Sequence, residues 1–365
     1  MSRSSRSRWI APAAVVAVVA GGAAAVPSLA GASDAAARLP ERSAAQLLDA
    51  VGAAHVDGLS GSVVQTSRLG LPELPDTGSG GGSAVTLTSL LSGSTTARIW
   101  MAGEDRSRIA VDAPFSEYDV VRDVKDLWTY DSAGSKVNHV VLPEGTAAEQ
   151  EALPTTPQTP QEAAKTLLEK VDPTTKVSVG RSATVAGRSA YELVLEPRTA
   201  GTLVQSVRIA VDGKTSVPLR VRVFGTDPVV PAFEVAFTSV RFEVPSSEVF
   251  SFVPPPGATV KEQALPSKTE YLSDEQYARK QAKAEKDHAA AAPEVLGTGW
   301  ASVVELKGAQ LPEDATGLLQ QMTRPVDGGR VLTSRLLSVL LLDDGRVFAG
   351  SVPAERLVEL AKTAR

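Results

Sequence analysis

A series of short alternating runs constrains the fold of this chain more than any other feature of its sequence. In the first half the runs are SGSVVQTSRLG, TTARIWMAG, DRSRIAVDA, EYDVVRD, LWTYDS and KVNHVVL. Apolar and polar residues alternate along each run, and Gly, Asp, Pro or Ser stands at its ends. Successive side chains of a β-strand point to opposite faces, so the pattern predicts an up-and-down antiparallel meander with one buried face.

A second series of runs includes a well-marked hairpin, SVRIAVDGKTSVPLRVRVF. Asp212-Gly213 predicts a tight turn between its two strands. One face of the hairpin is apolar, and periodicity alone does not decide whether that face meets an ordinary core or lines a cavity. Arg208, Arg220 and Arg222 fall on the opposite face, where we expect them to meet water.

Two segments have the pattern of helices with one buried stripe. In ERSAAQLLDAVGAAH, apolar residues recur at the helical spacing. In TPQEAAKTLLEKV, Thr159 is a candidate N-cap, Pro160 stands at the first helical position and Glu162 completes a capping box. We therefore expect one helix before the first series of strands and another before the second.

The carboxy-terminal part of the chain has a different composition. SDEQYARKQAKAEKDHAAAA has charges throughout and few large apolar residues, which is typical of a solvated connecting helix. Beyond it, residues 294–365 predict short strands and a final helix. The continuous apolar run LLSVLLL at 336–342 is too short to span a membrane and indicates a strand buried on both faces.

The first 32 residues have the layout of a secretory signal peptide. MSRSSRSRW carries three arginines, no charge occurs from Ile10 to Ala32, and Ala30-Gly-Ala32 has the form of a cleavage site. An uncleaved amino-terminal anchor is the alternative. Either segment implies export of the rest of the chain.

Charge and reactive side chains narrow the possible functions. The net charge of -5 does not favour nucleic acid as a partner. There is no cysteine, and the three histidines, His55, His139 and His288, lie in unlike contexts, so we expect no metal site and no catalytic base. The sequence also lacks nucleotide-binding and hydrolase motifs. We expect no cofactor and a protein that is not an enzyme.

Aromatic residues are few, and three in the predicted strands are candidates for ligand contact. Trp100 belongs to TTARIWMAG, and Trp128 and Tyr130 belong to LWTYDS. Such rings either fill a core or offer contact area to a hydrophobic ligand, and both alternatives remain open at this point.

The order of these elements resembles that of the LolA-like superfamily of periplasmic lipoprotein carriers and the RseB/MucB regulators of sigma-E. The resemblance covers residues 41–262 and is carried by VAGRSAYELVLEP, SVRIAVDGKTSVPLRVRVF, AFEVAFTSVRFEV and VFSFVPPPGATV. A weaker similarity joins DDGRVFAGSVPAERLVELA to the end of the RseB/MucB carboxy-terminal domain.

The resemblance implies an α+β fold: an unclosed antiparallel β half-barrel whose inner face is covered by helices, followed by a small α+β unit. The expected organisation is a signal peptide or anchor at 1–32, a LolA-like domain at 41–262, a charged helical linker at 263–293 and a small domain at 294–365.

The resemblance also implies a function. It implies an extracytoplasmic carrier, in the cell envelope or outside the cell, that shields the acyl chains of a lipid or lipoprotein and touches the membrane peripherally. The alternative is a regulator like RseB/MucB that binds a membrane anti-sigma factor during envelope stress. The residues expected to line the cavity are Ile99, Trp100, Trp128, Leu193, Val207, Ile209, Val211, Leu219, Val221 and Val223.

Overall fold

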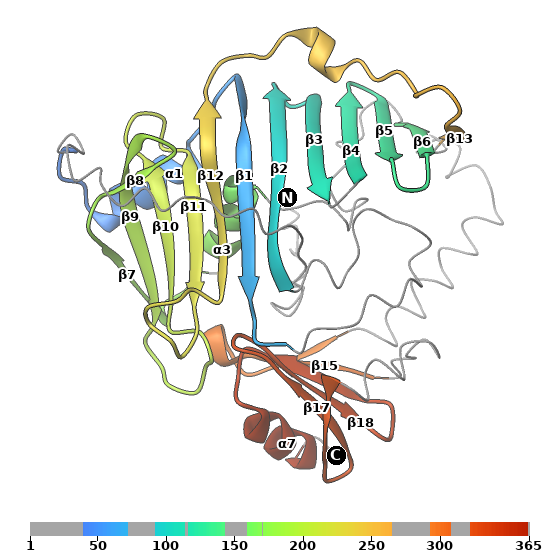
Figure 1. The fold of residues 1–365 in the computed structure, drawn as a ribbon. Coiled ribbons are helices and arrows are strands. Elements are labelled where there is room, and N and C mark those ends of the chain that lie inside the picture. Colours follow the sequence, from blue (N-terminus) through green and yellow to red (C-terminus); the bar gives the residue numbers. More distant parts are fainter. Residues whose placement is uncertain are drawn as a thin grey trace, which may run out of the picture.

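The computed structural model places the described residues in two β-sheets (Figure 1). The described residues are 39–71, 92–113, 116–142, 159–169, 171–264, 293–307 and 322–363. The expected signal peptide or anchor at 1–32 and nearly all of the expected linker at 263–293 lie outside them. No helix within these residues is long and apolar enough to cross a bilayer.

The first six strands of the larger sheet form the predicted meander. They are β1 (Gly58–Arg68), β2 (Ser92–Ala102), β3 (Arg106–Ala113), β4 (Ser116–Asp123), β5 (Asp126–Asp131) and β6 (Lys136–Val141). Each strand pairs antiparallel with the next one in the sequence. The alternating runs therefore identified these strands correctly.

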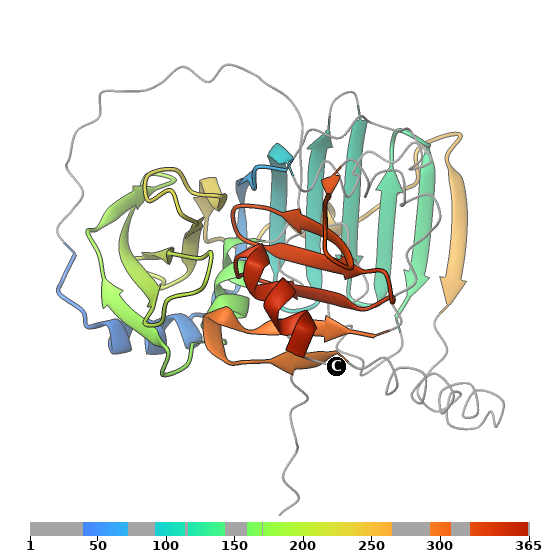
Figure 2. The same ribbon diagram turned by 90° about the horizontal axis from the view of Figure 1, so that it is seen from below.

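The second series of strands continues the same sheet on the other side of β1. It consists of β7 (Thr175–Val179), β8 (Ala183–Val185), β9 (Arg188–Pro197), β10 (Ser206–Asp212), β11 (Pro218–Phe224) and β12 (Phe233–Arg241). β12 pairs with β1 and joins the two series. Seen from below, these strands curl round, whereas the meander extends as a flatter wing (Figure 2).

The sheet does not close, because its strand order ends at β7 on one side and at β13 (Thr259–Ala264) on the other. β13 reaches its place by way of a short 3-10 helix, η3 (Ser247–Phe250), and pairs parallel to β6. The predicted unclosed and mainly antiparallel half-barrel is confirmed, with this one parallel pair in addition.

Two short helices cover one face of the curled half. They are α1 (Ala44–Gly52) and α3 (Pro160–Leu168). The predicted capping box of α3 is present: the Glu162 backbone N–H donates to the Thr159 hydroxyl, and the Glu162 carboxylate accepts from the Thr159 backbone N–H. α3 packs on β11 and β12, and α1 lies beside β7. The face that they cover is called the concave face below, and the other is called the convex face.

The smaller sheet holds the expected short strands and final helix. It consists of β14 (Glu294–Leu296), β15 (Val303–Leu306), β16 (Arg324–Val326), β17 (Gly329–Thr333), β18 (Ser338–Leu342) and β19 (Val347–Gly350), with α7 (Ala354–Thr363) packed against β17, β18 and β19. The apolar run at 336–342 is shorter as a strand than predicted. Ser338 and Leu340 are buried and the alternate residues only half-buried, while Leu336 packs into the core of the larger sheet instead.

Hydrogen bonds hold the smaller sheet against the lower end of the larger one, and one of them joins the Thr202 hydroxyl to the Ser351 carbonyl at 2.9 Å. The Leu203 backbone N–H donates to the Ser351 carbonyl at 2.7 Å, and the Arg335 N–H donates to the Leu69 carbonyl at 2.7 Å. A short 3-10 helix, η4 (Gly299–Ala301), carries Trp300, whose indole N–H donates to the Thr175 hydroxyl at 2.9 Å. The two sheets therefore share an interface of loops.

The predicted hairpin is β10 and β11, and its turn is wider than Asp212-Gly213 alone. The backbone N–H of Asp212 donates to the Val217 carbonyl at 2.9 Å, so the residues between them form the turn. The Asp212 carboxylate accepts two bonds from the Arg188 guanidinium, at 2.6 and 2.9 Å, and a third from the Thr215 backbone N–H. Burial opposes this charge, but the bonds from Arg188 and Thr215 outweigh it and lower the pKa of Asp212.

We expect Asp212→Asn to lower the free energy of unfolding by about 2 to 4 kcal/mol at pH 7, because it breaks a buried ion pair and removes a turn acceptor. The lowered pKa makes this contribution complete above the unfolded value of about 3.9, and it disappears as the pH falls through the folded value. Urea unfolding of both proteins at several pH values measures the difference. Asp344→Asn, at an exposed turn, is the control and should change stability much less.

Candidate functional site

The hairpin and its neighbours place most of the predicted cavity residues in a packed core. Leu193, Val207, Ile209, Leu219 and Val221 are fully buried on the concave face. The same hydrophobic cluster contains Val211, Ile99 and, partly buried, Val223, together with Leu47 of α1 and Ala163 and Ala164 of α3. In this half of the sheet, the apolar face therefore meets the two helices directly.

Trp100 and Trp128 lie on the convex face, apart from the other eight predicted residues. Directly paired residues of antiparallel strands point to the same face. Trp100 pairs with Arg108, and Trp128 pairs with His139. Ile99, next to Trp100 in β2, points the other way. The structure thus does not bring these two tryptophans together with the hairpin residues.

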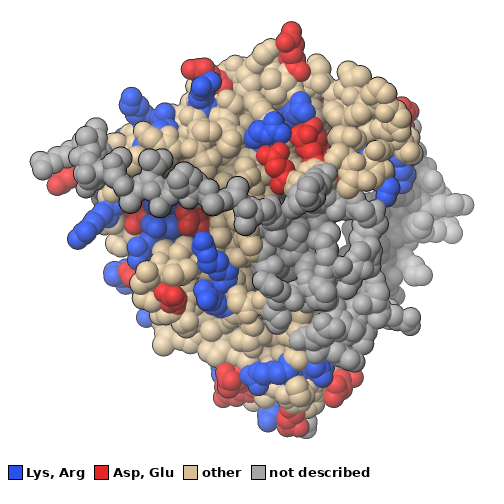
Figure 3. All heavy atoms as spheres, viewed as in Figure 1, with Lys and Arg blue, Asp and Glu red and all other residues tan. Residues whose placement is uncertain are grey.

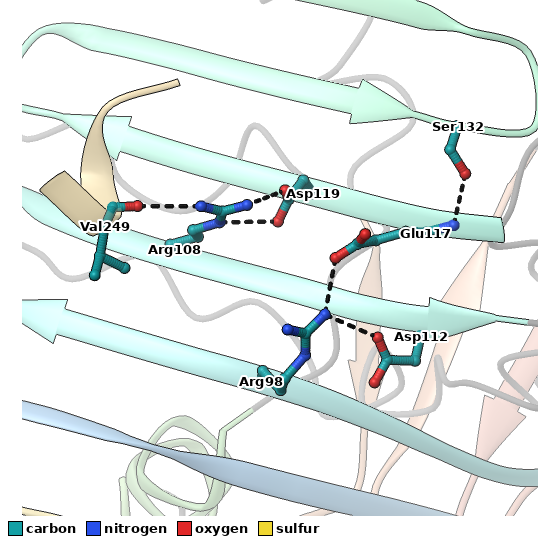
Figure 4. Close-up of polar contacts among 7 residues, drawn as sticks. All are labelled: Arg98, Arg108, Asp112, Glu117, Asp119, Ser132 and Val249. Carbon is teal, nitrogen blue, oxygen red and sulfur yellow. Dashed lines mark hydrogen bonds and ion pairs between the residues drawn. The ribbon is translucent and has the colours of Figure 1, made fainter. Parts of the chain in front are cut away.

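Charged side chains form an ion-pair network on the convex face of β2, β3 and β4 (Figure 4). The Arg108 guanidinium donates to both carboxylate oxygens of Asp119, at 3.2 and 2.5 Å, and its other terminal nitrogen donates to the Val249 carbonyl at 3.3 Å. Arg98 bridges Asp112 and Glu117 at 3.2 and 2.9 Å. Arg108 thereby ties the segment that contains η3 to the middle of the sheet.

The same segment covers the aromatic residues of β5. The Trp128 ring stacks on His139 with centroids 3.7 Å apart, and the Phe252 ring lies 5.5 Å from Trp128 and 6.1 Å from Tyr130. His139 also hydrogen bonds to Asp126 at 2.8 Å. For Trp128 this favours the packing interpretation over exposed ligand contact. Within the described residues, no group of His, Asp or Glu side chains is arranged to hold a metal ion.

The three arginines of the hairpin lie on the convex face as predicted, but they surround a carboxylate rather than meeting water alone. Glu192, on the adjacent strand β9, lies 2.5 Å from Arg222, 3.5 Å from Arg220 and 4.0 Å from Arg208. Burial and the neighbouring charge of Arg222 lower the pKa of the Arg220 guanidinium. Acidic and basic side chains are intermixed across this face (Figure 3).

The concave face of the meander is the stronger candidate for a binding site. It is mainly apolar, and the residues that point to it include Ala97, Ile109, Val111, Val120 and Leu127. Of these, Ile109 is half-buried and the other four are buried. Val120 and Leu127 belong to a cluster separate from the main core. Of the residues on the concave face of the meander, the sequence analysis named only Ile99 as a cavity residue. The alternation in DRSRIAVDA was a usable signal for Ile109 and Val111, whereas the adjacent valines of EYDVVRD left their faces ambiguous.

The described helices are too short to cover this whole face. α1 and α3 have nine residues each, which is about 13 Å of helix. Twelve strands lie side by side along the sheet, and at about 4.8 Å per strand they span roughly 50 Å. Since both helices pack on β7 to β12, the apolar row on the meander extends beyond them.

Three solved structures are similar to this chain at low sequence identity. MucB from Pseudomonas aeruginosa, solved with MucA, is 15% identical with a TM-score of 0.41 over 87% of this chain and 96% of that chain. A LolA superfamily protein from Nitrosomonas europaea is 10% identical with a TM-score of 0.24, covering 58% of this chain and 99% of its own. LprF from Mycobacterium bovis is 11% identical with a TM-score of 0.31, covering 56% and 96%.

These similarities concern the fold alone, since every identity is low and every TM-score is below 0.5. No family model and no curated protein matches this chain.

We expect Ile209→Trp to lower the free energy of unfolding by about 1 to 3 kcal/mol, because the fully buried Ile209 leaves no room for a larger ring. Thr184→Trp, at an exposed position of β8, is the matched control and should leave stability nearly unchanged. Thermal and urea unfolding followed by circular dichroism measure both. An Ile209→Trp protein as stable as the parent would show that this position borders open space.

Proposed function

We propose that this protein is an exported carrier that binds the acyl chains of a lipid or lipoprotein on the concave face of the meander. The observation that carries the proposal is the apolar row on β2 to β5, which extends past the two helices closing the other half. The proposed action is reversible binding rather than catalysis.

The lining of this face suits an acyl chain. The side chains at its centre are mainly Ala, Val, Ile and Leu, and polar groups such as Thr129 and Arg122 lie among them on the outer strands. Burial of each methylene group contributes about 0.8 kcal/mol, so ten methylenes supply about 8 kcal/mol before the cost of ordering the chain. An apolar ligand is therefore the class that this face favours.

The composition of the chain bears on whether the carrier has a covalently attached lipid. With no cysteine, the chain has no residue for a thioether-linked lipid anchor of its own. In the proposed function, residues 1–32 are either removed, which leaves a free exported protein, or kept, in which case they anchor the carrier to the membrane. The charge-balanced convex face then meets water while the concave face holds the ligand.

Ile109→Trp is expected to block the acyl-binding face. Ile109 is only half-buried and lies at the border between the main core and the meander cluster, so a larger ring is tolerated but occupies ligand space. We expect the affinity for a fluorescent diacyl phospholipid to fall at least tenfold, the equivalent of about 1.4 kcal/mol. The fluorescence titration uses the full exported chain.

Thr96→Trp is the matched control, because Thr96 is exposed on the convex side of the neighbouring strand. It should bind the phospholipid as the parent protein does. Native mass spectrometry after mild extraction should also detect a bound lipid on the parent. A ligand-free parent that ignores added diacyl lipid would contradict the proposed function.

A second candidate is a regulator that binds an exported segment of a membrane anti-sigma factor. The smaller sheet, docked on the loops of the larger one through Leu203, Arg335 and Trp300, favours it, since a minimal carrier does not need this unit. MucB, which has a similar arrangement, was solved in complex with MucA.

Size-exclusion chromatography with the exported domain of a single-span anti-sigma factor encoded beside this gene tests the second candidate. A stable complex that the lipid releases would support regulation. Separate elution of the two proteins under all lipid conditions would count against it.

A further inference from the structure

The loop between β11 and β12 lies at the lower end of the larger sheet (Figure 1). It exposes two adjacent valines. Its sequence, GTDPVVPA, occupies residues 225–232. The Val229 residue is 80% exposed and Val230 is 37% exposed. Single exposed apolar residues are common on protein surfaces, but a projecting apolar pair flanked by Pro228 and Pro231 is a more specific feature.

The loop is held in this shape by its own polar groups. The Asp227 carboxylate accepts from the Val229 N–H at 2.8 Å and from the Val230 N–H at 3.1 Å. Ala232 closes the loop, because its N–H donates to the Val223 carbonyl at 2.9 Å. The two prolines further restrict the backbone. The valines are therefore presented on a rigid tip rather than left free to fold back.

Two exposed arginines lie beside the tip. The Arg68 backbone N–H donates to the Ala232 carbonyl at 2.8 Å, which places Arg68 at the base of the loop. Arg335 lies next to Gly225, where an added Cβ would approach the Arg335 carbonyl oxygen within 2.7 Å. Its charge also acts on Asp227. The two arginines outnumber the one carboxylate of the loop, Asp227, so positive charge predominates at the base of the tip.

The opposite end of the sheet provides a contrast within the same molecule. Val244 is also exposed, but it follows the far end of β12, about 30 Å from the β11–β12 loop. Charged residues of both signs surround it in the sequence: Arg241 and Glu243 precede it, and Glu248 follows. Val244 is a single exposed valine, whereas the β11–β12 loop presents an adjacent pair with two arginines at its base.

We infer that the β11–β12 loop inserts Val229 and Val230 into the surface of an anionic lipid bilayer, with Arg68 and Arg335 at the headgroups. A folded protein would need a complementary pocket to bury a projecting apolar tip. A fluid bilayer needs none, because its lipids rearrange around the tip. Basic residues next to the insertion point gain from the negative surface potential of anionic lipid. The inference rests on the proposed function for its purpose, because a carrier of acyl chains must meet a membrane to exchange them.

A site-specific probe tests the insertion directly, since the chain has no cysteine of its own. Val229→Cys, labelled with an environment-sensitive fluorophore, should shift to shorter wavelength with vesicles of phosphatidylglycerol and phosphatidylcholine in equal parts. Val253→Cys, labelled in the same way at an exposed position on the η3 segment, is the control and should not shift. No shift at position 229, or equal shifts at both positions, would overturn the inference.

Vesicle co-sedimentation of unlabelled full chain gives the second measurement. Val229→Asp should weaken binding to the anionic vesicles about tenfold, because it replaces a membrane-buried valine by a charge. Val244→Asp should bind as the parent does. Arg68→Gln with Arg335→Gln should remove much of the dependence of binding on salt and on anionic lipid. Unchanged binding of Val229→Asp would contradict the inference.

The two proposals fail in different ways. If Val229→Asp loses vesicle binding but retains soluble diacyl phospholipid, the loop acts in docking and the concave face acts in ligand binding. If the parent protein binds vesicles through the loop yet holds no lipid in solution, the carrier function is wrong and the docking surface stands. A tip that binds a protein instead of vesicles would leave the position 229 probe unchanged in the vesicle assay and so refute insertion.

Discussion

Burial of the concave face is the constraint on which the rest of the structure depends. An open antiparallel sheet exposes one apolar face unless other elements cover it, and the aliphatic side chains of this sheet make that exposure costly. α1 and α3 meet the requirement for the curled half, where Leu47 and Ala164 join the hairpin residues in one core. The meander half has the same kind of apolar face but lies beyond these helices, and the proposed function follows from that difference.

The convex face is stabilised by different interactions. Glu192 lies among three arginines, and Arg108 joins Asp119 to the carbonyl of Val249. Removal of one partner from such a partly buried group leaves an uncompensated charge, so the loss of a partner destabilises the sheet more than the intact pair stabilises it. The same interactions stabilise the η3 segment on the convex face, where Phe252 packs against Trp128 before the chain enters β13.

The sequence was sufficient for features set by local chemistry. The alternating runs identified the strands, and the capping box of Thr159 and Glu162 identified the start of α3. The sequence did not predict that Trp128 is covered, because Phe252, which packs on it, is more than a hundred residues away in the sequence. It also did not separate the hairpin residues, on whose strands the helices pack, from the residues farther along the meander, since both sets have the same period. That distinction depends on where two nine-residue helices dock.

Isoleucine methyl NMR tests whether acyl chains bind on the meander face. The chain has four isoleucines, and Ile99, Ile109 and Ile209 all point to the concave face. Ile109 lies on the meander, whereas Ile209 is fully buried in the helix-covered core. On titration with a short-chain diacyl phospholipid, we expect a large shift of the Ile109 methyl signal and little change at Ile209. A shift confined to Ile209, or no shift at any of the three, would contradict acyl-chain binding on the meander face.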